Sequence, residues 1–180
     1  EGHTGAEFVI VGSGPHGADP HHEYSDRVIE PDDVVVIDIG GPVEPGYNSD
    51  STRTCCFTPP PVEIAVAYAA LQVALARAVD SVRPGVTAES IDAAARELLR
   101  ERGLAENFIH RTGHGIGLSV HEEPYIVGGN DLLLRPGMAF SVEPGVYFAG
   151  RWGARIEDIV VVTDDGHEAL NVRPHDLVVL

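Results

Sequence analysis

The sequence predicts an α+β domain in which an antiparallel β-sheet is backed by helices. The first observation is the order of the expected elements: three β-prone segments, then two helices, then further β-prone segments, a segregation typical of this class. The second is the length, because 180 residues suffice for one domain with a substantial core. The third is composition, since 43% hydrophobic and 22% charged residues are ordinary for a globular protein.

The first third of the chain predicts strands. Residues 8–11 are a short β-prone run that ends in the turn-rich stretch 12–20. Residues 34–39, VVVIDI, form a clear strand, and residues 47–57 alternate well enough to be its hairpin partner. Three glycines and two prolines in residues 40–46 predict the connection between the two.

Two helices are predicted next. Three consecutive prolines precede residues 62–82, and this Ala-rich segment with few charges predicts a largely buried helix. Thr87 is a good N-cap for a second helix over residues 88–102, and Gly103 is its C-terminal stop.

The rest of the chain predicts mainly strands. They are expected around residues 109–120, 138–148 and 156–163, with a last piece near Leu177. Residues 128–135 are expected to form a loop.

Charge and hydropathy narrow the function classes. The formal net charge of −16 disfavours nucleic-acid binding, because an acidic surface repels phosphate backbones. No apolar run approaches ~20 residues, so no membrane span is expected. The start lacks a signal-peptide pattern and an initiator Met, which suggests a fragment. Adjacent Cys55 and Cys56 cannot easily bond to each other, which favours a reducing, cytoplasmic compartment.

Acidic residues interrupt segments that should be apolar. Asp38, Asp50, Glu143 and Glu157 each lie inside or at the mouth of a β-prone run. One such acid alone is more often a satisfied polar residue, but four in one small domain need a common explanation, because burying a lone carboxylate costs several kcal/mol. With His114, which glycines flank, they are a plausible ligand set for two divalent ions. Oxygen-rich ligation with one nitrogen favours Mn or Co over a structural zinc.

Five motifs now point to a family. They are SGPHGADPHH, DIGGPVEPGYNSDSTRT, HRTGHGIGLSVHEEP, SVEPGVY and RIED, in that order and across nearly the whole chain. Together they resemble the catalytic domain of the pita-bread metallopeptidases, which include Xaa-Pro aminopeptidases, prolidases and methionine aminopeptidases. The resemblance implies the pita-bread fold, a curved antiparallel sheet backed by helices.

The resemblance also implies a ligand set for two divalent metal ions, with Mn first and Co or Zn as alternatives. Asp38 matches the ligand that holds one ion, and Asp50 and Glu157 match the bridging carboxylates. His114 matches the sole histidine ligand, and Glu143 matches a ligand that is also the general base.

Three further side chains, all histidines, match positions around the substrate. His121 resembles the residue that contacts the substrate and stabilises the tetrahedral intermediate, and His110 matches a position near the substrate. His21 matches a histidine near the residue after the scissile bond, whereas His22 is better explained as an exposed loop residue. Arg155 is expected to pair with a carboxylate and to fix its orientation.

The implied function is a dinuclear-metal peptidase that hydrolyses the bond before proline near the N-terminus of a peptide. RIED has the form found in proline peptidases, because methionine aminopeptidases have a neutral residue before the glutamate and a histidine after it. Whether the enzyme is an Xaa-Pro aminopeptidase or an Xaa-Pro dipeptidase is left open. The alternatives are a methionine-aminopeptidase-like enzyme and a non-catalytic binding module. The expected partner is a peptide with proline after the scissile bond, with no nucleic acid, no membrane and a possible homodimer.

Three features depart from the family pattern. The segment between Asp38 and Asp50 is one residue longer than expected, which suggests a wider hairpin loop. His16 stands where an asparagine is usual. Residues 1–180 are expected to form one catalytic domain that lacks the first helical segment of the fold and a preceding N-terminal domain.

Overall fold

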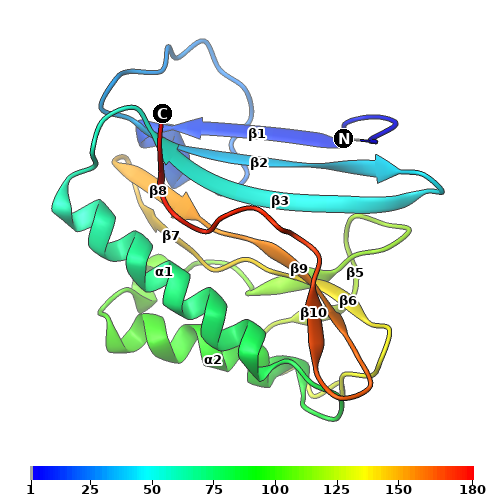
Figure 1. Cartoon of the computed structure of the whole chain (residues 1–180). Coiled ribbons are helices and arrows are strands. Elements are labelled where there is room, and N and C mark those ends of the chain that lie inside the picture. The colour runs from blue at the N-terminus through cyan, green and yellow to red at the C-terminus, as the bar shows by residue number, and fades with distance from the viewer. Residues whose placement is uncertain (1) are drawn as a thin grey trace.

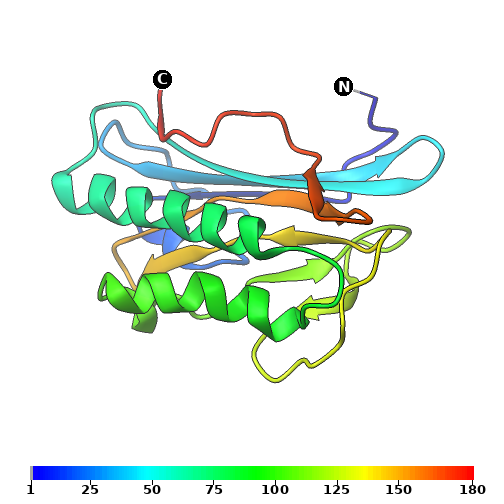
Figure 2. The same cartoon turned by 60° about the horizontal axis from the view of Figure 1, so that its bottom comes forward.

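Two helices lie together on one side of antiparallel sheets in the computed structural model, which describes residues 2–180 (Figures 1 and 2). This arrangement confirms the predicted α+β class. The elements in chain order are β1 (Phe8–Ser13), the 3-10 helix η1 (Gly14–Ala18), β2 (Val34–Val43), β3 (Tyr47–Cys56), α1 (Val62–Ser81), α2 (Ala88–Glu101), the 3-10 helix η2 (Ala105–Asn107), β4 (Gly113–Gly115), β5 (Glu122–Ile126), β6 (Ala139–Val142), β7 (Gly145–Phe148), β8 (Trp152–Arg155), β9 (Asp158–Val162), β10 (His167–Ala169) and β11 (Val178–Val179).

The N-terminal sheet has the strand order β1-β2-β3-β11. Its central hairpin is longer than predicted, because Val43 still pairs with Tyr47 and the connection is the turn of residues 44–46. The expectation of a connection over residues 40–46, and of a wide loop, is therefore wrong. Glycine suits Gly40 inside the strand because a Cβ there would lie 2.4 Å from the Ser49 carbonyl oxygen. Gly46 has φ of +124°, which fits the turn.

The C-terminal strands form a sheet of order β10-β9-β6-β4-β5 and a separate pair, β7-β8. The strand expected over 138–148 is interrupted at residues 143–144, and the strand expected over 156–163 begins only at Asp158, after a break at residues 156–157. At the first break, proline at 144 has no N–H to donate to a neighbouring strand. At the second break, the Glu157 N–H donates to the Thr52 carbonyl oxygen of the N-terminal sheet at 3.2 Å. The chain changes sheets at both breaks, so Glu143 and Glu157 lie at the crossing rather than inside a strand.

One other expectation about the C-terminal part needs correction, and one is confirmed. Only Gly113–Gly115 is a strand within the segment 109–120 expected to be β. The ladder with β5 shifts register between Gly113 and Gly115, and a Cβ at Gly113 would lie 1.8 Å from the Ser141 carbonyl oxygen. The piece near Leu177 is the short strand β11, which pairs in parallel with β3.

Both helices match their predicted ranges closely. Thr87 occupies the N-cap position of α2, although its side chain makes no capping hydrogen bond. Gly103 follows α2 with φ of +72°, as expected of a C-terminal stop. The helices pack on each other and on the sheets, which places the core between these layers (Figure 2).

Helix α1 is long and apolar enough to cross a membrane by length and composition alone, with 20 residues and a mean hydropathy of 1.6. The expectation that no apolar run approaches this length is therefore wrong. In this fold α1 is a core helix: Leu71, Ala74, Leu75 and Ala78 are at most 1% exposed.

Candidate metal centre

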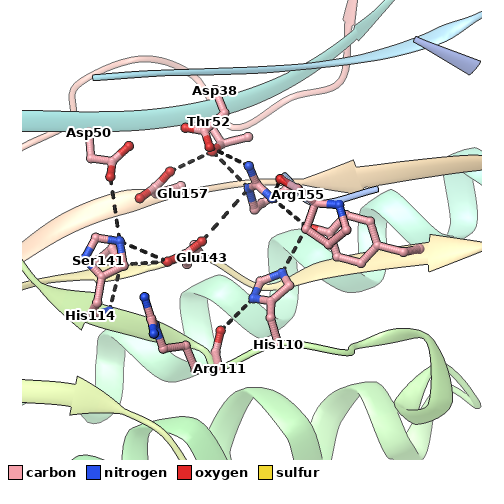
Figure 3. Close-up of polar contacts among 12 residues, drawn as sticks. Asp38, Asp50, Thr52, His110, Arg111, His114, Ser141, Glu143, Arg155 and Glu157 are labelled. Atoms are coloured by element: carbon pink, nitrogen blue, oxygen red, sulfur yellow. Dashed lines mark hydrogen bonds and ion pairs between the residues drawn. The ribbon is translucent and has the colours of Figure 1, made fainter. Parts of the chain in front are cut away.

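A cavity of about 1120 Å³ lies where the two sheet systems face each other, and the five predicted ligands line it. Figure 3 shows carboxylates from the N-terminal hairpin facing side chains from the C-terminal strands. Strands β2, β3 and β4 carry one ligand each, and the two sheet crossings carry the glutamates. The five side chains are Asp38, Asp50, His114, Glu143 and Glu157.

Three of these side chains converge closely enough to hold one ion. Asp50, His114 and Glu157 each offer one ligand atom, and the three atoms lie within 4.8 Å of one another. His114 Nε2 also lies 3.4 Å from Glu143 Oε1. Asp38 has only one oxygen free to face the other ligands, because its Oδ2 accepts a hydrogen bond from Arg155.

His114 is held in the tautomer that a metal ligand needs. Its Nδ1 lies 3.1 Å from the Gly115 carbonyl oxygen, so Nδ1 carries the proton and donates it. Burial lowers the pKa of His114 to about 4, so the ring is neutral at physiological pH. The Nε2 lone pair therefore faces the carboxylates, an arrangement that a cation between them stabilises.

Three of the carboxylates each have one buried oxygen without a partner. Among residues 2–180, Asp38 Oδ1, Asp50 Oδ1 and Glu157 Oε1 are buried oxygens without a hydrogen bond. Burial, and then the neighbouring Asp38 and Glu143 charges, raise the pKa of Asp50 to about 8. Burial also raises the pKa of Glu143 to about 7. Partnerless oxygens and a facing imidazole lone pair fit divalent cations well.

The raised pKa values predict an unusual pH dependence for the metal-free protein. An unfolded Asp or Glu titrates near pH 4, so the folded state holds extra protons on Asp50 and Glu143 from there up to about pH 7–8. His110 and His114, with lowered pKa values, act in the opposite sense below about pH 6.5, so the free energy of unfolding in EDTA should fall, by roughly 2 kcal/mol, as the pH rises from about 6.5 to about 8.

Urea denaturation at several pH values measures this fall. Asp50→Asn should flatten the slope, whereas Asp32→Asn, at an exposed position, should leave it unchanged. Mn²⁺ at pH 8 should restore stability, because it replaces the lost protons. A metal-free stability that rises over this range would contradict the prediction.

Arg155 organises the other side of the cavity. It is 3% exposed, and its Nη2 donates to Asp38 Oδ2 at 2.5 Å. Its Nε donates to Thr52 Oγ1 at 3.1 Å, and Thr52 Oγ1 in turn donates to Glu157 Oε2 at 2.6 Å. One arginine thus fixes the orientation of two carboxylates, one directly and one through Thr52. Sequence reasoning missed Thr52, although strand alternation from Asp50 places it on the same face.

His110 lies in a chain of hydrogen bonds. Arg155 Nη1 donates to the Tyr147 hydroxyl at 2.8 Å, and that hydroxyl lies 2.9 Å from His110 Nε2. His110 Nδ1 lies 2.7 Å from the Arg111 carbonyl oxygen, so Nδ1 donates and Nε2 accepts from Tyr147. Burial lowers the pKa of His110 to about 3, which keeps the ring neutral. Nothing in the sequence alone singled out Tyr147.

The remaining predicted histidines lie at the cavity mouth. His121 and His21 are both exposed and line the cavity. The His121 ring packs edge-on against His114, with 4.1 Å between ring centroids. His22, by contrast, packs against His16 at 4.3 Å.

The C-terminal segment braces the strands that carry Asp50 and Glu157. The Asn171 side chain donates to the Asp50 carbonyl oxygen at 3.0 Å and accepts from the Ile159 N–H at 2.7 Å. Arg53 donates to the Glu157 carbonyl oxygen at 2.5 Å and pairs with Asp158. These contacts join β3 to β9 behind the cavity, and sequence reasoning missed them because they link distant segments.

Known proteins resemble this chain over its whole length. The model of metallopeptidase family M24 matches residues 1–164. A protein of Mycobacterium tuberculosis named probable dipeptidase PepE is 65% identical over 180 residues, 100% of this chain and 48% of the relative. The Xaa-Pro dipeptidase of Lactobacillus delbrueckii subsp. lactis is 42% identical over 96% of this chain and 46% of the relative.

Solved structures agree. The crystal structure of X-Pro aminopeptidase from Thermotoga maritima superposes with a TM-score of 0.96 at 42% identity, over 99% of this chain and 51% of that one. The fold is therefore the pita-bread fold expected from the motifs. The chain spans about half the length of the curated relatives it matches.

Proposed function

Because the chain belongs to metallopeptidase family M24, we propose that it hydrolyses the peptide bond before proline, near the N-terminus of a peptide, using two divalent metal ions. The observation that carries the proposal is the convergence of the five ligands around buried carboxylate oxygens that lack partners. The printed names of the relatives, dipeptidase, Xaa-Pro dipeptidase and X-Pro aminopeptidase, support the class of substrate.

In this proposal Asp50 and Glu157 would hold both ions, Asp38 would hold one of them, and His114 and Glu143 would complete the set. We propose manganese as the native metal, because oxygen-rich ligation with a single imidazole suits it. Two bound divalent ions would activate a water molecule as the nucleophile and polarise the scissile carbonyl. The free cysteines at 55 and 56, both buried, support a cytoplasmic location.

Glu143 is the proposed general base. The Ser141 hydroxyl donates to Glu143 Oε1 at 3.0 Å, and Glu143 Oε2 lies 4.0 Å from Arg155 Nε, so both oxygens of the carboxylate are oriented. As a carboxylate beside the proposed ions, Glu143 can accept a proton from the attacking water and return it to the leaving nitrogen.

The histidines complete the site. His121, at the mouth, is placed to donate a hydrogen bond to the carbonyl oxygen as negative charge develops there. His110, which burial keeps neutral, accepts a hydrogen bond from Tyr147 and borders the cavity. His21 lines the same cavity from the loop after η1 and is proposed to lie near the residue after the scissile bond.

The test is an assay of the purified protein after Mn²⁺ loading and after EDTA treatment. The substrates are an Xaa-Pro dipeptide, an Xaa-Pro-Xaa tripeptide and a Met-Ala-Ser control. We expect Mn²⁺-dependent cleavage of proline substrates and none of Met-Ala-Ser. Cleavage of Met-Ala-Ser alone would favour the methionine-aminopeptidase alternative. Two bound metals without turnover of any substrate would contradict the proposed activity for this chain.

A further inference from the structure

A second arginine lines the cavity, and the proposed metal centre does not use it. Arg111 is half-buried and precedes β4, between His110 and His114. Within residues 2–180 its guanidinium makes no hydrogen bond or ion pair. Its aromatic contact is with Tyr125, whose ring centroid lies 5.0 Å from the guanidinium carbon. Arg155, in contrast, is bonded to Asp38.

An unpaired cation is unexpected at this place. The chain has a net charge of −16, and four carboxylates of the metal centre share the cavity. In Figure 3 the Arg111 side chain extends towards His114 and Glu143 without reaching a partner.

The charge balance indicates what this cation would bind. Two divalent ions would offset the four carboxylates of the centre, and the two arginines would then leave the cavity positive even though Glu7 also lines it. A guanidinium presents a planar fork that matches a carboxylate, and the Tyr125 ring beneath it limits its orientations. Apolar side chains of Ile10, Leu118 and Val120 share the cavity and suit a pyrrolidine ring.

We propose that Arg111, supported by Tyr125, binds the C-terminal carboxylate of a dipeptide whose second residue is proline. This inference rests on the proposed function and narrows it, because a longer peptide or an amide has no carboxylate at this point. Arg111 is thus a specificity-determining residue that selects dipeptides over longer substrates.

The experiment compares Ala-Pro with Ala-Pro amide, which share the scissile bond, as substrates of the Mn²⁺-loaded protein. The wild type should prefer the acid. Arg111→Met should raise KM for Ala-Pro about 10- to 100-fold and leave kcat and the amide kinetics nearly unchanged, because one charge-assisted contact is lost. Arg111→Lys should recover part of the loss. Arg83→Ala, which removes an exposed arginine outside the cavity, should have no effect.

Other outcomes would overturn the carboxylate site. The first is a wild type that hydrolyses Ala-Pro and Ala-Pro amide equally well. The second is a preference for Ala-Pro over its amide that Arg111→Met retains. The third is an equal loss of activity on both substrates in Arg111→Met, which would indicate a structural role. If the wild type hydrolyses neither substrate, the proposed function fails on its own. Calorimetry with L-proline and L-prolinamide then decides: tighter proline binding that Arg111→Met abolishes supports the site, and its absence refutes it.

Discussion

Asp50→Asn and Glu157→Gln are each expected to lower metal-dependent turnover at least about 10³-fold, the largest effect that the site predicts. Each substitution keeps the shape of a buried side chain and removes the charge that would bridge the two ions. The metal content should fall from two ions per chain to one or none. Elemental analysis after gel filtration measures the metal content, and the Ala-Pro assay measures turnover.

Matched controls separate a local effect from a general loss of charge. Asp32→Asn and Glu168→Gln remove exposed acids outside the cavity and should leave both metal content and turnover unchanged. Full metal content and activity in Asp50→Asn would mean that this carboxylate does not bridge the ions.

Arg155→Met is expected to lower the free energy of unfolding by about 3–5 kcal/mol, because it removes one partner of a buried ion pair. Asp38 would be left buried without its cation, and the hydrogen bonds to Thr52 and Tyr147 would be lost with it. Turnover should fall by about 10²-fold or more, since two ligand carboxylates lose their orientation. Urea denaturation and the Ala-Pro assay measure the two effects.

If Arg155→Met does not fold, the stability and turnover of Arg155→Lys test the same interactions. It keeps the charge beside Asp38 but cannot donate to Thr52 and Tyr147 together, so stability should recover more than turnover. Arg77→Met is the control, because its pair with Glu101 is exposed and 3.5 Å apart. That change should stay within about 0.5 kcal/mol. A similar small change for Arg155→Met would show that the buried pair adds nothing.

The ligand residues could be predicted because their chemistry conflicts with their surroundings. An acid such as Asp38 inside VVVIDIG violates the pattern of a buried strand, and that conflict is visible in one sequence. The helices were predictable because their signals are also local: proline precedes the first helix and glycine follows the second. The breaks at Glu143 and Glu157 were not, because they depend on hydrogen bonds to strands far away in the chain.

Other residues around the site gave no local signal. Tyr147 reads as an ordinary strand residue, and only its contacts with Arg155 and His110 show its position in the site. Arg111 reads as a surface charge until the cavity is seen. Asn171 follows a short strand in sequence but braces Asp50 across the fold. Sequence periodicity and motif spacing do not identify side chains whose role depends on tertiary contacts.

The most direct test of a two-metal centre is an anomalous difference map from a crystal soaked in Mn²⁺. We expect two peaks in the cavity, about 3.5–4 Å apart. Both should lie within bonding distance of Asp50 and Glu157, with His114 Nε2 on one of them. A single peak, or peaks only at exposed acids such as Asp32, would contradict a centre built from these five side chains.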